Sequence, residues 1–131
     1  MSARIPSAEA YASEPVQYPP MTVVDIAAEA AGVTDEYRNQ VLSQVNTSCL
    51  RLGVLSGEYP WHLHPRSDEL FLVMEGRLEI ELADGRTLRL DPRQSVVVPA
   101  GTVHRTRGVG RTINLCFEAL AAETVFVDGP G

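Results

Sequence analysis

The chain contains no lysine, since all eleven of its basic residues are arginine. This absence excludes a Schiff-base lysine, a lysine general base and a Walker-type phosphate loop, which depends on a lysine. The sequence also contains neither a G-x-S-x-G nucleophile elbow nor a G-x-G-x-x-G dinucleotide fingerprint. Several large classes of covalent and nucleotide-dependent enzymes are therefore excluded.

Positive charge and long apolar runs are also scarce. The net charge is −6, which disfavours nucleic-acid backbones and anionic membrane surfaces as partners. No apolar stretch approaches the length that spans a bilayer, and the N-terminus lacks the apolar core of a secretory signal. We therefore expect a cytoplasmic protein that binds neither nucleic acid nor membranes.

Only two cysteines occur, Cys49 and Cys116, and both lie in apolar segments far apart in the sequence. Buried free thiols are the favoured interpretation for a chain expected in the cytosol, and a disulfide is the alternative.

The length of 131 residues is that of one ordinary domain. Residues 1–20 carry four of the nine prolines, and we interpret them as a flexible proline-rich arm, either disordered or packed on a partner. Residues 21–131 are expected to form the single domain. Within it, "MTVVDIAAEAAGV" predicts a short helix that ends near Gly32.

From about Gln40 onward the signals are those of β-strands. "QVLSQVN" and "CLRLGVL" are short and rich in apolar residues, and "ELFLVM" is a nearly continuous apolar run, typical of a strand covered on both faces. "RLEIEL" alternates strictly, and Asp84-Gly85 after it is a strong hairpin signal. "TLRL", "QSVVVP", "TINLCFEAL" and "ETVFV" supply further strands. Many short strands separated by Gly/Pro turns indicate an antiparallel barrel or a double-sheet sandwich.

The three histidines of the chain all lie at ends of predicted strands. His62 and His64 are two residues apart, so on a strand both side chains project from the same face. Glu69 begins the next apolar strand, and His104 follows the turn around Pro99 and Gly101. Three imidazoles and one carboxylate are good ligands for Fe, Mn, Ni or Zn, and an octahedral shell would keep two positions open.

Each of these residues also has a plainer interpretation. A pair such as His62 and His64 occurs on protein surfaces, Glu69 is compatible with a simple charge at a strand end, and His104 with a hydrogen-bonded turn residue. The joint arrangement at neighbouring strand ends favours a metal site over these separate roles.

The order of these residues resembles the two sequence motifs of the cupin superfamily. Gly57, His62, His64, Glu69 and Gly76 follow the order of the first motif, with one residue fewer before His62. Pro99, Gly101 and His104 match the second motif, whereas Arg93 and Gly108 replace its glycine and its asparagine. The resemblance implies an all-β fold, a double-stranded β-helix or jelly-roll barrel, with His62, His64, Glu69 and His104 as metal ligands inside it.

The resemblance does not choose a reaction, because the superfamily combines one fold with many activities. We expect a metal-dependent enzyme acting on a small organic molecule, either dioxygenase-like or isomerase/lyase-like. The alternative is a non-catalytic cupin that binds a sugar or sugar acid. Because small barrels leave strand edges that need covering, a homodimer is also expected, with the arm and Trp61 as candidate contacts.

Side chains next to the motifs have expected orientations. By alternation, Arg105 and Arg107 face away from His104 while Thr106 shares its face. Phe71 and Val73 are expected on the same face as Glu69, where they line an apolar cavity or simply fill the core, and Trp61 is expected on the outer face.

Overall fold

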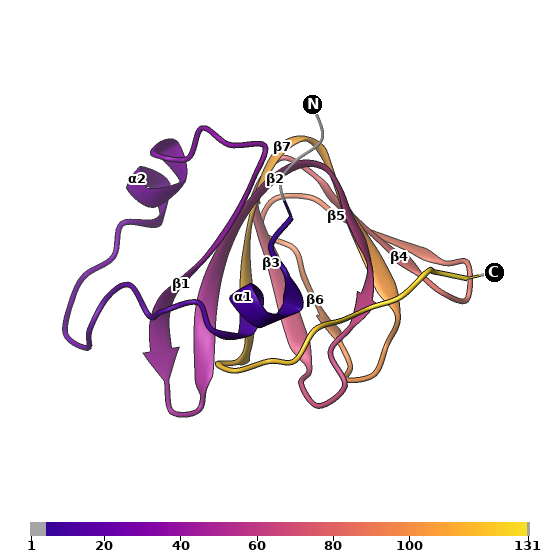
Figure 1. Cartoon of the computed structure of the whole chain (residues 1–131). Coiled ribbons are helices and arrows are strands. Elements are labelled where there is room, and N and C mark those ends of the chain that lie inside the picture. Colours follow the sequence, from indigo (N-terminus) through magenta and orange to yellow (C-terminus); the bar gives the residue numbers. More distant parts are fainter. Residues whose placement is uncertain (1–4, 131) are drawn as a thin grey trace.

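Two long strands, β2 (Ser48–Leu63) and β7 (His104–Ala119), run antiparallel through the whole fold in the computed structural model, which describes residues 5–130 (Figure 1). Each has sixteen residues and contributes to both layers of a jelly-roll barrel. The other strands are β1 (Tyr37–Val45), β3 (Glu69–Glu75), β4 (Leu78–Leu82), β5 (Thr87–Leu90), β6 (Ser95–Val98) and β8 (Val125–Phe126).

The two layers share β2 and β7. One layer follows the order β1-β2-β7-β3-β6 and uses the first half of β2 and the second half of β7. The other layer contains β8, the second half of β2, the first half of β7, β4 and β5. Strands that pass from one layer to the other are the usual way of closing such a double sheet.

The bend between the layers depends on a close approach at Gly108. The register of β2 and β7 shifts between Leu55 and Gly57, opposite Gly108. A Cβ atom at Gly108 would lie 2.5 Å from the carbonyl oxygen of Leu55, so a side chain cannot fit there without a backbone shift. Arg93 stands where the cupin motif has a glycine. It takes the left-handed conformation, with φ of 68°, which glycine adopts more readily than other residues.

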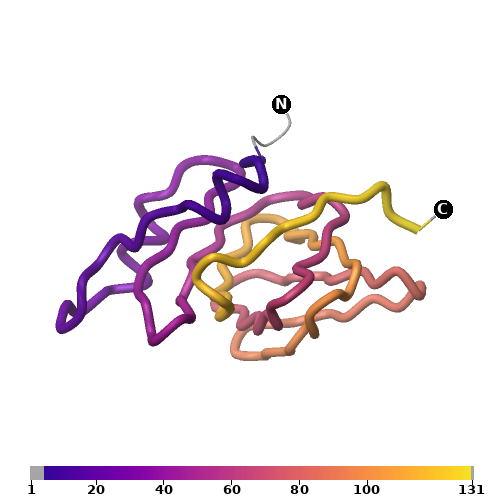
Figure 2. The backbone as a smooth tube through the Cα atoms, turned by 60° about the horizontal axis from the view of Figure 1, so that its bottom comes forward, coloured from indigo at the N-terminus to yellow at the C-terminus, as the bar shows by residue number. Residues whose placement is uncertain are grey.

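Two short helices lie outside the strands. Helix α2 (Ile26–Ala31) begins at Asp25, whose side chain accepts a hydrogen bond from the backbone N–H of Ala28. Helix α1 (Ala8–Ala12) belongs to the proline-rich segment and lies across one end of the barrel (Figure 1). Figure 2 shows the same segment beside the C-terminal segment, and Figure 1 agrees.

Apolar side chains form two clusters. The first fills the barrel between the layers and includes Leu55, Phe71, Val73, Leu78, Ile80 and Cys116. The second lies outside the barrel, where α2 and residues near it cover Leu42, Leu52, Val54 and Ile113. None of the helices in the described part of the chain has the length and apolarity needed to cross a membrane.

The all-β fold class and the jelly-roll topology are confirmed, as is the helix ending before Gly32. The strand "ELFLVM" is covered on one face only, because Phe71 and Val73 are buried whereas Leu70 and Leu72 remain partly exposed. Both cysteines are buried free thiols. In the expected arm, residues 5–20 include α1 and a bridge from Val16 to Val41 of β1. The flexibility of this arm stays a prediction.

We predict that Gly108→Ala destabilises the fold by about 1–3 kcal/mol, the typical cost of overpacking, because its Cβ would collide with the Leu55 carbonyl oxygen. Gly32→Ala is the matched control, since its Cβ would meet no atom closer than 3.6 Å and its φ is −76°. We expect the control to stay within about 0.5 kcal/mol of wild type in urea unfolding. Equal stability of the two variants would contradict the role given to Gly108.

Candidate metal centre

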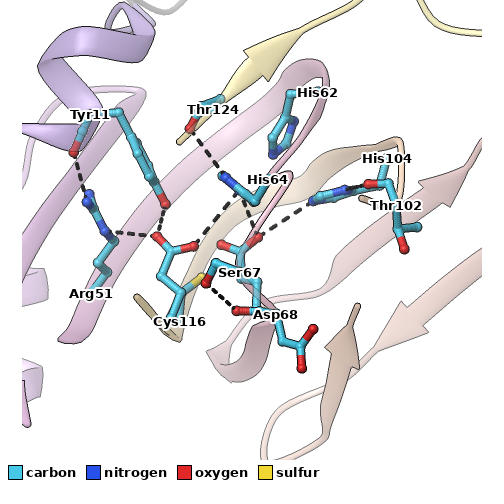
Figure 3. Close-up of polar contacts among 12 residues, drawn as sticks. Tyr11, Arg51, His62, His64, Ser67, Asp68, Thr102, His104, Cys116 and Thr124 are labelled. Carbon is cyan, nitrogen blue, oxygen red and sulfur yellow. Dashed lines mark hydrogen bonds and ion pairs between the residues drawn. The ribbon is translucent and has the colours of Figure 1, made fainter. Parts of the chain in front are cut away.

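The four side chains singled out in the sequence come together inside the barrel. One potential ligand atom from each of His62, His64, Glu69 and His104 lies within 4.8 Å of the others, and all four residues are buried. Figure 3 shows His62 and His64 on one segment and His104 approaching from another. The group can therefore hold a single metal ion.

Strand pairing explains why residues so far apart in the sequence meet. His62 of β2 and His104, the first residue of β7, are direct partners in the ladder, and their ring centroids are 4.3 Å apart. His64 follows the end of β2, and the N–H of Gly101 donates to its carbonyl oxygen at 2.9 Å. Glu69 opens β3 opposite Val98 of β6. Each side chain thus lies at or next to the end of a strand, and the strand pairing fixes its position.

Backbone carbonyls set the orientation of all three imidazoles. The Nδ1 atoms of His62, His64 and His104 lie 2.8 Å from the carbonyl oxygens of Pro60, Glu123 and Thr102, respectively. A carbonyl oxygen can only accept, so each Nδ1 carries a proton and donates. In a neutral ring the lone pair is then on Nε2, the atom that faces the cluster in His64 and His104, as metal-ligating histidines require.

Among the residues that the structure describes, no arginine pairs with the carboxylate of Glu69. Its Oε1 lies 3.3 Å from Nε2 of His64 and 3.6 Å from Nε2 of His104. Among the described residues, Glu69 Oε1 and His104 Nε2 are buried without any hydrogen-bond partner. Buried polar atoms without partners are costly, and a bound cation would satisfy both. The donor set therefore fits a divalent metal ion.

The pKa values reflect the same charge balance in the metal-free chain. Burial and then the neighbouring His104 lower the pKa of His62 to about 3. Burial alone would lower the pKa of His64, but the close approach of the Glu69 carboxylate outweighs it and raises the pKa to about 9. Burial opposes ionisation of Glu69 as well, yet the neighbouring imidazoles of His104 and His64 hold its pKa far below the usual value. A proton on His64 thus partly replaces the cation.

A small cavity is lined by three of these four side chains, His62, His64 and Glu69. It has a volume of about 40 Å³, enough for a few water molecules. Phe71 and Thr106 line it, as their strand positions predict, and so does Cys116. Val73 is not among the lining residues and packs in the core instead. Polar groups around the cavity include Tyr11, Tyr37, Asn39, Tyr59 and Asn114. The mixture of apolar wall and few polar groups is typical of a site for a small molecule.

Arg105 and Arg107 face away from the cavity, as alternation predicts. Arg105 pairs with Glu81 and Arg107 with Glu79 on the neighbouring strand β4. Trp61 is on the outer face as well, where the guanidinium of Arg105 lies 4.9 Å from its ring centroid.

Sequence reasoning missed Tyr59 as a cavity residue. Simple alternation places it with Trp61 on the outer face, but the register of β2 shifts between Tyr59 and His62. The bulge turns Tyr59 inward, where its ring lies 4.7 Å from that of His62. A bulge has no reliable sequence signal in this segment.

A buried group of three charged or polar residues was missed too. Arg51 and Glu118 form an ion pair with an Nε–Oε1 distance of 3.0 Å, and Tyr11 of α1 donates a hydrogen bond to the same carboxylate. The other oxygen of Glu118 lies 3.9 Å from Nε2 of His64, so this group adjoins the metal cluster (Figure 3). Burial, together with the charge of Glu69, raises the pKa of Glu118 above its usual value. The strictly apolar neighbours of Arg51 in "CLRLGVL" were the available signal.

Comparison with known proteins agrees with this geometry. A family profile described as "Cupin domain" matches residues 54–117, which include all four candidate ligands. The chain belongs to the cupin superfamily. It is 48% identical over 104 residues to the uncharacterised protein YdbB of Bacillus subtilis (strain 168), covering 79% of this chain and 92% of YdbB.

Two further similarities are more distant or shorter. A crystal structure of a cupin-2 domain protein from Shewanella frigidimarina matches with a TM-score of 0.70 and 26% identity, covering 74% of this chain and 94% of that one. The polyketide synthase CurC of Streptomyces cyaneus is 47% identical over 49 residues, which is 37% of this chain and 31% of CurC. The small cupin fold is thus shown by sequence and structure alike.

We predict that the wild-type cupin, purified without a histidine tag, binds about one divalent ion per chain. His62→Ala and His104→Ala should each weaken the metal affinity by more than about a hundredfold, since even outer partners of metal ligands contribute 10–100-fold. Glu75→Gln, an exposed carboxylate at the end of β3, serves as the control. Elemental analysis and metal titration measure the result, with circular dichroism to verify the fold. Full metal occupancy in both histidine variants would contradict the site.

Proposed function

We propose that this cupin is a metal-dependent enzyme acting on a small organic molecule through a centre of His62, His64, Glu69 and His104. The observation that carries the proposal is the convergence of their four ligand atoms within 4.8 Å beside a small cavity. Structural zinc sites are usually closed and rich in thiolates, whereas this set holds imidazoles and a carboxylate. Four protein ligands in an octahedral shell keep positions open for a substrate.

The chain's own residues would have distinct roles. The backbone carbonyls of Pro60, Glu123 and Thr102 hold the imidazoles in one orientation, so the ligands need no rearrangement when a substrate enters. Phe71 and other apolar side chains of the wall exclude water and strengthen electrostatic contacts inside. A bound divalent ion would supply Lewis-acid polarisation of a substrate oxygen, and a redox-active one could support oxidation by dioxygen.

The reaction is dioxygenase-like or isomerase/lyase-like. Both types use a substrate that binds a metal through oxygen or sulfur, such as a diol, an enol or a thiol. The cavity of about 40 Å³ favours molecules smaller than a sugar in the conformation seen here, which supports an enzyme over the sugar-binding alternative. The short match to CurC, named as a polyketide synthase, supports a carbonyl-containing substrate.

Activity with a defined metal tests this proposal. We expect Fe(II)-loaded protein to consume oxygen with a member of a panel of diols, enols and thiols, or Mn-, Ni- or Zn-loaded protein to isomerise or cleave one. His104→Ala should lower kcat/KM by about a hundredfold or more, while Glu75→Gln keeps it. The proposal fails if no metal form turns over any compound while sugars or sugar acids selectively raise Tm.

We also propose a homodimer, formed through an apolar row on the outer face of the β2-β7-β3-β6 layer. Leu50, Phe117, Leu70 and Val97 are successive partners across these four strands. Phe117 is 40% exposed and Val97 is 51% exposed, although the chain carries a net charge of −6. A second copy presents the same uncharged row, so a two-fold contact is self-complementary.

For the dimer, light scattering should give twice the chain mass at micromolar concentration. Phe117→Arg should shift the protein to the monomer, because two-fold symmetry places like charges together. Val109→Arg is the control, since Val109 is 46% exposed but lies outside this row. A monomeric mass for wild type, unchanged at high concentration, would reject the dimer.

A further inference from the structure

Arg51 and Glu118 form a fully buried ion pair that the metal cluster itself does not require. Both side chains have no solvent exposure, and their Nε and Oε1 atoms are 3.0 Å apart. Arg51 also donates through Nη1 to Oδ1 of Asn39 at 2.9 Å and through Nη2 to the carbonyl oxygen of Tyr11 at 2.8 Å. Burying two charges costs more than packing two apolar residues, so the pair calls for a functional explanation.

Tyr11 connects this pair to the metal cluster. The guanidinium carbon of Arg51 lies 3.8 Å from the centroid of the Tyr11 ring. The Tyr11 ring also stacks on the imidazole of His64, with ring centroids 5.8 Å apart. The hydroxyl of Tyr11 donates to Oε1 of Glu118. Helix α1 therefore supplies a side chain that contacts the carboxylate, its arginine partner and one candidate metal ligand (Figure 3).

The two oxygens of Glu118 are not equivalent. Oε1 is held by Arg51 and Tyr11, whereas Oε2 is buried and has no hydrogen-bond partner among the residues described. Oε2 lies 3.9 Å from Nε2 of His64, on the side of the ring that faces the cluster. A buried carboxylate oxygen without a hydrogen-bond partner is costly unless another molecule donates a hydrogen bond to it.

We propose that Glu118 Oε2 is a substrate-binding group that accepts a hydrogen bond from a donor on the metal-bound molecule, with Tyr11 and Arg51 as positioning residues. This inference rests on the proposed function, since it needs a molecule at the open metal positions. It narrows the substrate to small compounds that carry a hydroxyl, N–H or ammonium donor next to the atom that binds the metal.

Two other roles for Glu118 are physically distinct. Glu118 could serve as an additional metal ligand, although the group whose ligand atoms all lie within 4.8 Å of one another consists of His62, His64, Glu69 and His104 alone among the described residues. The ion pair could also only attach α1 to the barrel. The first role predicts an effect on metal affinity, and the second predicts no effect on which ligands bind.

A matched pair of probes separates these roles. Acetohydroxamate and N-methylacetohydroxamate chelate a metal through the same two oxygens, but only the first has an N–H donor. Binding to Co(II)-loaded protein is followed by the visible spectrum of the ion, so no enzymatic turnover is needed. We expect wild type to prefer acetohydroxamate by about tenfold or more, the typical effect of a hydrogen bond to a charged group.

Two variants test whether Glu118, positioned by Tyr11, causes the preference for acetohydroxamate. Glu118→Gln and Tyr11→Phe should both keep the affinity for Co(II), while Glu118→Gln removes most of the preference and Tyr11→Phe reduces it several-fold. Tyr11→Phe retains the ion pair of Arg51 and Glu118, so it remains informative if Glu118→Gln does not fold. Glu75→Gln is the control and should keep the full preference.

Each outcome either supports the inference or overturns it. The inference is supported if wild type prefers acetohydroxamate, Glu118→Gln loses most of this preference and Tyr11→Phe weakens it. No preference in wild type, or one that survives Glu118→Gln, overturns the inference alone. A loss of Co(II) affinity in Glu118→Gln shows a metal ligand and overturns it as well. Failure of wild type to bind Co(II), or to bind either chelator once loaded, overturns the proposed function together with the inference.

Discussion

The buried carboxylate of Glu69 sets the requirement that the rest of the site meets. It lies inside the barrel, with its Oε1 3.3 Å and 3.6 Å from imidazole nitrogens of His64 and His104, and this oxygen has no hydrogen-bond partner among the described residues. A buried negative charge must be compensated by a cation, by protons or by hydrogen bonds. In the metal-free chain a proton on His64, whose pKa rises to about 9, provides part of this compensation. A divalent ion would provide all of it, which is why the donor set points to a metal.

The fold meets this requirement through strand pairing and backbone acceptors. The ladder of β2 and β7 fixes His62 opposite His104, and β3 begins with Glu69. Three carbonyl oxygens then fix the imidazole rings at Nδ1. Because these constraints come from the backbone, the site is formed before any ligand binds. Substitutions in the apolar wall around Phe71 could therefore change substrate specificity without displacing the ligand side chains.

Much of the fold and the four candidate ligands could be predicted from the sequence, because both depend on local patterns. The alternation of "RLEIEL", the turn at Asp84-Gly85 and the spacing of the histidines are signals of that kind. Residues that depend on long-range contacts could not be found this way. Tyr11 and Glu118 are 107 positions apart in the sequence. Arg51 is a single charged residue in the otherwise apolar segment "CLRLGVL", so the sequence does not reveal its partner. The bulge before His62 reverses the orientation of Tyr59. The contact of Tyr11 with Glu118 arises only when α1 covers the end of the barrel, and the position of Tyr59 arises only from the bulge in β2.

The most direct test of the account is X-ray absorption spectroscopy at the K edge of the bound metal. We predict a first shell of nitrogen and oxygen atoms only, at about 2.0–2.2 Å for zinc, with outer-shell scattering from three imidazoles. The same spectrum should not change when Cys116 is replaced by serine. A sulfur atom in the first shell, or scattering from fewer than three imidazoles, would contradict the assignment of His62, His64, Glu69 and His104 as the ligands.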